Sequence, residues 1–66
     1  MRYVIIVEWS GVQFIRFDGR HKVLTRDIQL AAKFDSKEDA EAERIWLLYS
    51  EVMSVPEALA LVALEV

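Results

Sequence analysis

A chain of 66 residues with no cysteine and one histidine excludes disulfide bridges and makes a structural zinc site improbable. Its hydrophobic content of 55% is high for so small a domain, and its formal net charge is −3. Small domains bury a low fraction of their surface and often need a partner for stability. We therefore expect one domain over residues 1–66, without a cofactor, that associates with another chain.

The charge is unevenly distributed along the chain. Residues 1–33 hold six Lys or Arg and three acids, a net +3, whereas residues 34–66 hold two basic residues and eight acids, a net −6. A solvated helix with acids near its N-terminus explains the second half. The alternative is a bipolar surface that orients a partner.

Residues 3–17 have the pattern of a β-hairpin. Residues 3–9 are β-branched or aromatic apart from Glu8, Ser10-Gly11 is a turn dipeptide, and residues 12–17 resume the strand pattern. A two-residue loop would pair Trp9 with Val12. Side chains alternate between the faces of a strand, so one face would carry Arg16 and six apolar residues: Tyr3, Ile5, Val7, Trp9, Val12 and Phe14. The other face would carry Val4, Ile6, Ile15 and Phe17, so both faces need a cover.

The segment after the hairpin is harder to assign. Residues 18–22 have the composition of a turn, and residues 23–25 suit a short third strand. Asp27 is expected to cap one helical turn, with Ile28 and Ala31 or Ala32 facing inward. Residues 33–34 suit a short extended piece.

The main helix is predicted over residues 37–52. It begins with Ser36-Lys37-Glu38-Asp39, which matches a capping box. Its apolar residues form two clusters rather than one stripe. The first contains Ile45, Leu48 and Val52. The second contains Ala42, Trp46, Tyr49 and Met53, and needs a loop or another chain to cover it.

The last part of the chain is predicted to return to the sheet. Ser54-Val55-Pro56-Glu57 is a second capping box that would start one helical turn. Residues 60–65 are predicted as a strand beside the first strand. The fold class is therefore α+β: a small antiparallel sheet made by the N-terminal hairpin and the C-terminal strand, with one main helix, in the order ββ(β)αβ.

One helix can cover only one face of this sheet. The uncovered face is predicted to form the interface of a homo-oligomer, with a dimer favoured, through Tyr3, Ile5, Val7, Trp9, Val12 and Phe14. The second helical cluster supplies a candidate site for a protein partner, formed by Trp46, Tyr49 and Met53, because Trp and Tyr are common anchor residues.

The sequence lacks the residues of an active site. His21 is the only histidine, and the four serines fall in the predicted hairpin turn (Ser10), at the two caps (Ser36, Ser54) and on the helix (Ser50). The acids near residue 38 lack the spacing of a calcium loop. We therefore expect a non-catalytic protein without a metal site.

Nucleic-acid binding is the alternative function. Four basic residues of the hairpin and its following loop could form a patch near Phe14 and Trp9: Arg16, Arg20, Lys22 and Arg26. Aromatic side chains on an open sheet can stack on bases. The acidic net charge and the lack of glycines in residues 12–17 make this the weaker alternative.

The segment from Ala31 to Ala42 resembles small phage or prophage α+β proteins of unknown role. In these, a hairpin is followed by a helix start of the form A-x-x-F-D-S-x-E-x-A, which residues 31–40 match. The resemblance implies a mobile-element protein that binds a host protein, such as an inhibitor of a defence system. It carries over no site residue.

The cellular location is expected to be the cytoplasm, or the host cytoplasm if the chain is phage-encoded. The longest apolar run is far shorter than a membrane span, and Met1-Arg2 leads directly into the first strand without a signal-peptide pattern.

Overall fold

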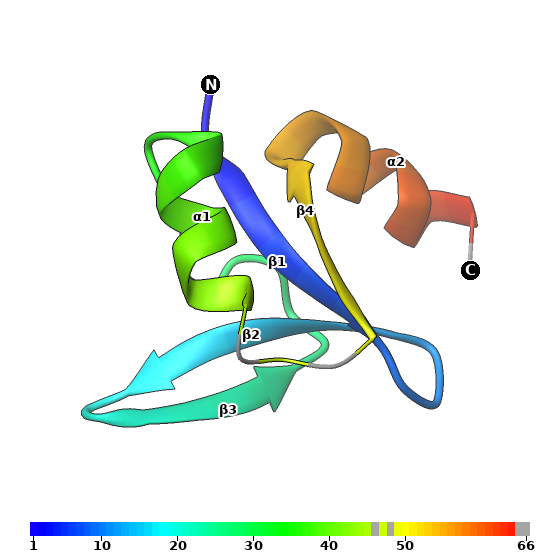
Figure 1. Ribbon diagram of the computed structural model, residues 1–66. Helices are drawn as coiled ribbons and strands as arrows, with labels where there is room; N and C mark the ends of the chain where they lie inside the picture. The colour runs from blue at the N-terminus through cyan, green and yellow to red at the C-terminus, as the bar shows by residue number, and fades with distance from the viewer. Residues whose placement is uncertain (46, 48, 65–66) are drawn as a thin grey trace.

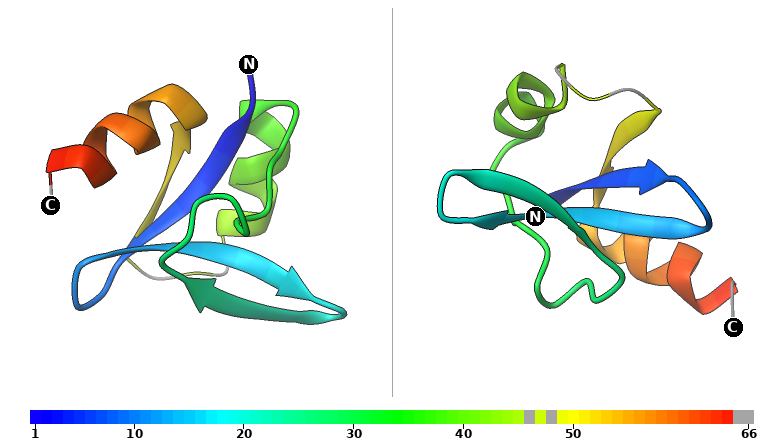
Figure 2. Two further views of the ribbon diagram at one scale, coloured as in Figure 1. Left: turned by 180° about the vertical axis from the view of Figure 1, so that it is seen from behind. Right: turned by 90° about the horizontal axis from the view of Figure 1, so that it is seen from below.

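The computed structural model describes residues 1–45, 47 and 49–64. The elements in chain order are β1 (Tyr3–Glu8), β2 (Val12–Asp18), β3 (His21–Thr25), α1 (Lys37–Arg44), β4 (Ser50–Ser54) and α2 (Val55–Leu64) (Figure 1). The strands form one antiparallel sheet in the order β3-β2-β1-β4. Figure 2 shows α1 and α2 on opposite sides of this sheet. The predicted α+β class, with its N-terminal hairpin, is confirmed.

The hairpin between β1 and β2 has a different register from the predicted one. Ile6 lies opposite Phe14, and Glu8 lies opposite Val12, so the loop contains three residues, 9–11, rather than two. A shift of one residue moves every side chain of a strand to the other face of the sheet. The predicted grouping of Val12 and Phe14 with the odd-numbered residues of β1 is therefore wrong.

One face of the sheet, which we call the α2 face, is covered by the C-terminal helix. Its buried cluster consists of Val4, Ile6, Val12, Phe14, Ala31 and Ala58. Partly buried residues of α2, β4 and the segment after β3 pack against this cluster: Ile28, Met53, Val55, Leu61 and Val62. The even-numbered residues of β1 thus share this face with the even-numbered residues of β2.

The opposite face, which we call the α1 face, is covered by the first helix. Its buried cluster consists of Ile5, Val7, Ile15 and Ala40, with Tyr3, Phe34, Leu47 and Val52 packed around it. Phe17 and Phe34 make an edge-to-face contact at its margin, with ring centroids 6.2 Å apart. Both faces of the sheet are therefore covered within one chain.

The six residues predicted as an oligomer interface do not form an exposed face. Ile5, Val7, Val12 and Phe14 are all 8% exposed or less, Tyr3 is partly buried, and only Trp9 is well exposed. They also lie on both sides of the sheet. The prediction that Tyr3, Ile5, Val7, Trp9, Val12 and Phe14 form one uncovered surface is wrong, because a second helix covers the face for which the sequence provided no cover.

The second covering helix, α2, can form because the first helix is shorter than predicted. The predicted helix over residues 37–52 stops at Arg44, and residues 50–54 form β4, which pairs with β1. Val4 and Ile6 are fully buried, so their backbone N–H and C=O groups must find partners. β4 supplies these partners and occupies the edge of β1 that was assigned to residues 60–65.

The predicted C-terminal strand is instead helix α2. The predicted capping box is confirmed, because Ser54 Oγ accepts a hydrogen bond from the Glu57 N–H (3.4 Å) and donates one to Glu57 Oε1 (2.7 Å). Pro56 lies in the first turn, where a missing N–H costs nothing. The box therefore starts a helix of ten residues rather than a single turn.

The first helix begins as predicted. Ser36 is its N-cap, and the hydroxyl of Ser36 accepts a hydrogen bond of 3.1 Å from the Asp39 N–H. Before it, Asp27 Oδ1 accepts from the Gln29 N–H at 2.9 Å, which confirms the predicted turn. The predicted third strand is also confirmed, as the longer β3.

The segment between β3 and α1 crosses from the α2 face to the α1 face through a fork in the sheet. β1 and β2 pair only near their connecting loop and then diverge (Figure 1). In the opening, the Ala32 N–H donates to Ile15 O at 2.9 Å, and Phe34 exchanges two hydrogen bonds of 2.9 Å with Tyr3. Lys33 Nζ stabilises the preceding turn by donating to three backbone carbonyls, including Ile28 O at 2.7 Å. The crossing places one helix on each face.

A pair of matched substitutions tests the helical assignment of residues 55–64. Ala58 is fully buried and Ala60 is exposed. We expect Ala58→Asp to cost about 3–5 kcal/mol of unfolding free energy, because it buries an unpaired charge, and Ala60→Asp to change it by about 0.5 kcal/mol or less. Chemical denaturation measures both. In a strand the two positions would share a face, so equal effects would contradict the helix.

Candidate functional site

The main candidate site is a groove on the α1 face, near the loop that joins β1 to β2. Six residues line it: Val7, Trp9, Ile15, Lys22, Leu24 and Leu47. The groove has a volume of about 320 Å³. It remains open because α1 has only eight residues, or about 12 Å of helix, and so cannot cover the whole face. Five of the six lining residues are apolar, which suits an apolar side chain of a partner.

Two exposed aromatic side chains stand beside the groove. Trp9 is 61% exposed and Tyr49 is 75% exposed, and their ring centroids are 6.4 Å apart at an interplanar angle of 42°. Tyr49 has a positive φ of 59°, which is rare for a residue other than glycine. The pair joins the hairpin loop to the residue before β4, and we call it the Trp9–Tyr49 edge.

Local hydrogen bonds hold the loop that carries Trp9. Gln13 Nε2 donates to Trp9 O at 2.6 Å, and Arg26 Nη2 donates to Ser10 O at 2.8 Å. Ser10 and Gly11 both have positive φ, of 57° and 95°. Glycine is favoured at position 11, because its φ is one that other residues rarely adopt and a Cβ atom would lie 3.1 Å from the Arg26 guanidinium.

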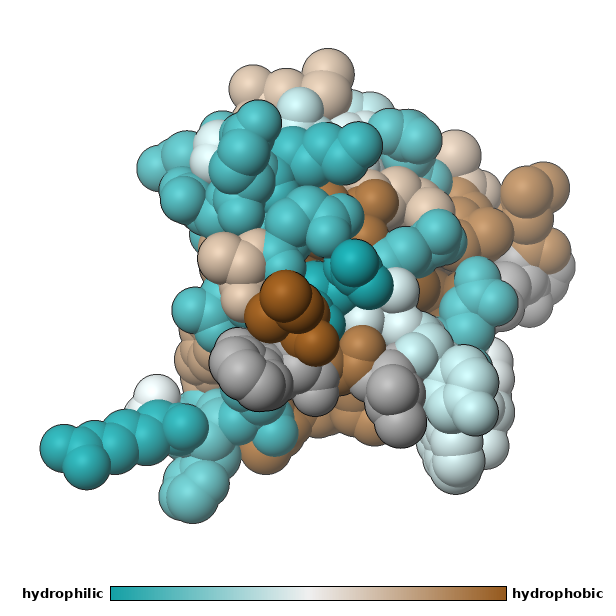
Figure 3. Space-filling model, in the orientation of Figure 1, coloured by the Kyte–Doolittle hydropathy of each residue, from teal (hydrophilic) through white to brown (hydrophobic). Residues whose placement is uncertain are grey.

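The groove has a charged rim on the side of β3. Lys22 Nζ lies 3.3 Å from Glu43 Oε2 of α1, in a pair that is partly exposed on both sides. Exposed pairs of this kind contribute little stability, but this one ties β3 to α1 across the groove. Figure 3 shows teal surface around α1 and at the lower left of the view, and brown and pale surface at the lower centre and lower right.

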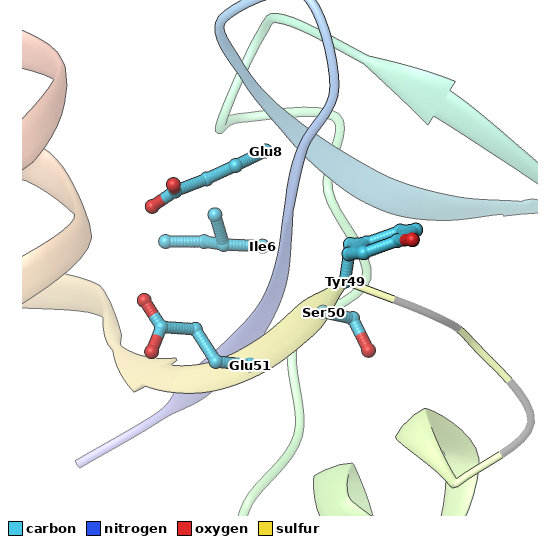
Figure 4. Close-up of a pocket in the computed structure, with 5 residues that line it drawn as sticks. All are labelled: Ile6, Glu8, Tyr49, Ser50 and Glu51. Carbon is cyan, nitrogen blue, oxygen red and sulfur yellow. The ribbon is translucent and has the colours of Figure 1, made fainter.

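A second hollow of about 320 Å³ lies on the other side of Tyr49, lined by Ile6, Glu8, Tyr49, Ser50 and Glu51 (Figure 4). Figure 4 shows Glu8, Ile6 and Glu51 projecting to the same side, with the Tyr49 ring turned away from them. Among the described residues, neither the Glu8 nor the Glu51 carboxylate has a hydrogen-bond or ion-pair partner. This hollow therefore carries negative charge on the α2 face.

The residues predicted to bind a protein partner are not brought together by one helix. Tyr49 and Met53 lie beyond the end of α1, at and after the start of β4. Tyr49 is exposed beside the groove, whereas Met53 packs on the α2-face cluster and is only partly exposed. Trp46 lies outside the described residues. The ring of Tyr49 contacts the ring of Trp9, and the sequence offered no signal for this contact.

The residues predicted to contact nucleic acid do not form one patch. Arg16 and Lys22 lie on opposite faces of the β2–β3 ladder, since Lys22 pairs with Phe17, the neighbour of Arg16. Arg20 is in the turn at one end of this ladder, and Arg26 is bonded to the hairpin loop at the other end. Phe14 is fully buried and cannot stack on a base.

Three of the four serines considered for chemistry have structural partners. Ser36 and Ser54 are helix caps, and Ser50, which begins β4 rather than lying on a helix, donates to Leu47 O at 3.0 Å. In the part of the chain that the structure describes, no group of three or more His, Asp or Glu side chains is placed to hold a metal ion. Neither described helix has the length and apolar content that a membrane crossing needs.

Two arginine substitutions with the same change of charge test how the Trp9 loop is held. We expect Arg26→Ala to shift the Trp9 indole resonance in an NMR spectrum and to cost about 1 kcal/mol, because it removes the hydrogen bond to Ser10 O. Arg20→Ala, in an exposed turn without such a bond, should leave the resonance and the stability unchanged. Equal spectra for both variants would show that Arg26 does not order the loop.

Comparison of the chain with protein-family models, with curated proteins and with solved structures found no match in any of the three.

Proposed function

We propose that this chain is a non-catalytic protein-binding module whose contact surface is the groove with its Trp9–Tyr49 edge. One observation carries this proposal: two large aromatic side chains lie exposed and in contact beside an apolar groove. Trp and Tyr are enriched among the residues that dominate binding energy at protein interfaces. An aromatic anchor next to an apolar pocket is the usual centre of such an interface.

The local structure supports Trp9 and Tyr49 as anchors because their backbones are already ordered. Hydrogen bonds at both sides of the hairpin loop restrain the backbone of Trp9, and Tyr49 directly precedes β4. Binding would therefore cost little free energy for ordering the backbone of the loop that carries Trp9. The groove offers neighbouring space for one or two apolar side chains of that partner.

Self-association stays a prediction, but it does not follow from an uncovered sheet. Both faces of the sheet are covered within the chain, so a dimer would use the groove and the Trp9–Tyr49 edge instead. The phage or prophage origin and the inhibitory role implied by the resemblance also stay predictions. Nucleic-acid binding is less well supported, since its four basic residues are dispersed and Phe14 is buried.

Capture of a protein from a host lysate tests the binding surface. We expect Trp9→Ala and Leu47→Asp to reduce capture at least about tenfold, because an anchor residue contributes about 2 kcal/mol or more. Leu59→Asp is the matched control, since Leu59 is 49% exposed on α2, away from the groove. Equal capture by all variants would show that the groove is not the binding surface.

Light scattering at micromolar concentration tests self-association. A monomer that remains well folded would contradict the predicted homo-oligomer, and burial of both sheet faces within the chain is consistent with such a monomer. If a dimer forms, we expect Trp9→Ala to dissociate it without lowering the thermal stability of the monomer, because Trp9 is largely exposed.

A further inference from the structure

The strand β3 forms one edge of the sheet and has a free side. It is last in the strand order β3-β2-β1-β4, and β2 is its main packing partner among the described elements. Lys22 and Leu24 are exposed, and Figure 1 and Figure 2 show β3 at the outer margin of the molecule. A free edge of this kind is a template for pairing with another extended chain.

The backbone groups that face outward follow from the hydrogen bonds on the other side of β2. Ile15 O accepts from Ala32, so the backbone groups of Ile15 point away from β3. Successive residues of a strand point their backbone groups in opposite directions, so those of Phe14 and Arg16 point toward β3. Their partners in β3 are the odd-numbered residues. The N–H and C=O groups of Lys22 and Leu24 therefore point outward.

The other edge of the sheet is less available. The Val55 N–H donates to Arg2 O at 2.9 Å, which places the outward-facing groups of β4 at its even-numbered residues. One of these, Ser50 O, already accepts a hydrogen bond of 3.2 Å from Arg44 Nη1. Strand β4 also packs against both helices. Of the two edges of the described sheet, β3 is therefore the one that combines outward-facing backbone groups with an exposed position.

The free edge is continuous with the groove. The side chains of Lys22 and Leu24 line the groove on the α1 face, together with Ile15 of β2 and Val7 of β1. A strand added beside β3 would lie about 4.8 Å away, and every second side chain of it would point to the α1 face. Backbone pairing would then supply affinity, and the groove would select an apolar side chain.

The charge around β3 indicates which side chains a strand added beside it should carry. Three basic residues are spaced along this edge: Arg20 lies in the turn before β3, Lys22 in the strand and Arg26 just after it, and Lys22 is also paired with Glu43 of α1. An extended segment that carries Asp or Glu would complement this edge. A second copy of β3 would not, because antiparallel self-pairing brings the same basic residues together.

We propose that the outer edge of β3 binds an extended acidic segment of a partner protein as a fifth strand, with an apolar side chain of that segment in the groove. This inference rests on the proposed binding function and specifies the partner. The backbone N–H of Leu24 would donate to the added strand, and the Trp9–Tyr49 edge would close the end of the groove.

Selection from a displayed library of random peptides of about 10 residues tests the proposal, with the intact chain as the target. We expect the enriched peptides to combine Asp or Glu with alternating apolar residues. When an enriched peptide is synthesised and bound to the chain, hydrogen exchange should show new protection at the backbone amides of Lys22 and Leu24. Failure to enrich binders, enrichment of basic sequences, or protection confined to another element would overturn the proposal.

A matched pair of substitutions isolates the backbone contact. Leu24→Pro removes an outward N–H without removing a bond to β2, and proline is tolerated at such edge positions. Leu24→Ala shortens the side chain but keeps the N–H. We expect Leu24→Pro to weaken peptide binding about tenfold more than Leu24→Ala does. Equal weakening would overturn strand addition, and if Leu24→Pro does not fold, the hydrogen-exchange result decides.

Two further outcomes separate this proposal from the general function. Peptide binding that requires Trp9 but is unaffected by Leu24→Pro would retain the binding function and overturn the strand addition. A dimer in light scattering that Leu24→Pro dissociates would show that β3 pairs with a second copy, which overturns the acidic partner. Loss of peptide binding in both Trp9→Ala and Leu24→Pro, with binding kept in Leu59→Asp, supports both proposals.

Discussion

A sheet that is apolar on both faces must be covered on both, and this constraint shapes the whole chain. Val4 and Ile6 point to one side of β1, and Ile5 points to the other, and all three are fully buried. Neither face can be left to water at a cost of about 1.5–3 kcal/mol for each large apolar side chain. Within 66 residues the chain therefore provides two helices, one on each side.

The fork between β1 and β2 is what allows so short a chain to place helices on both sides. β3 ends near the α2 face, where Ile28 and Ala31 pack, and α1 begins on the α1 face. The segment between them passes through the opening and bonds to Ile15 and Tyr3 on the way. These bonds satisfy backbone groups that would otherwise be unpaired where the two strands diverge.

The short length of α1 also explains the groove. Helix α1 ends at Arg44 because the chain must return to form β4, so neither described helix lies above the α1 face near the hairpin loop. The exposed Trp9 and Tyr49 and the free edge of β3 surround this area. The part of the α1 face beyond the end of α1 is thus where we place the proposed binding surface.

The sequence by itself determined the α+β class, the N-terminal hairpin, the third strand and both helix starts, since each depends on neighbouring residues. Ser36 and Ser54 cap helices through bonds to residues three positions ahead, and such patterns are visible in one segment. Tertiary structure decided the hairpin register, because a loop of two or three residues around Ser10-Gly11 is locally acceptable, and packing of Phe14 beside Ile6 selects between them. It also decided that residues 50–54 form a strand and residues 55–64 a helix. The free energy of pairing β1 and covering the α2 face is gained only in the assembled fold, and it outweighs local preference. The candidate site followed from these choices, because Trp9, Tyr49 and Leu24 are brought together by the register, the early end of α1 and the strand order.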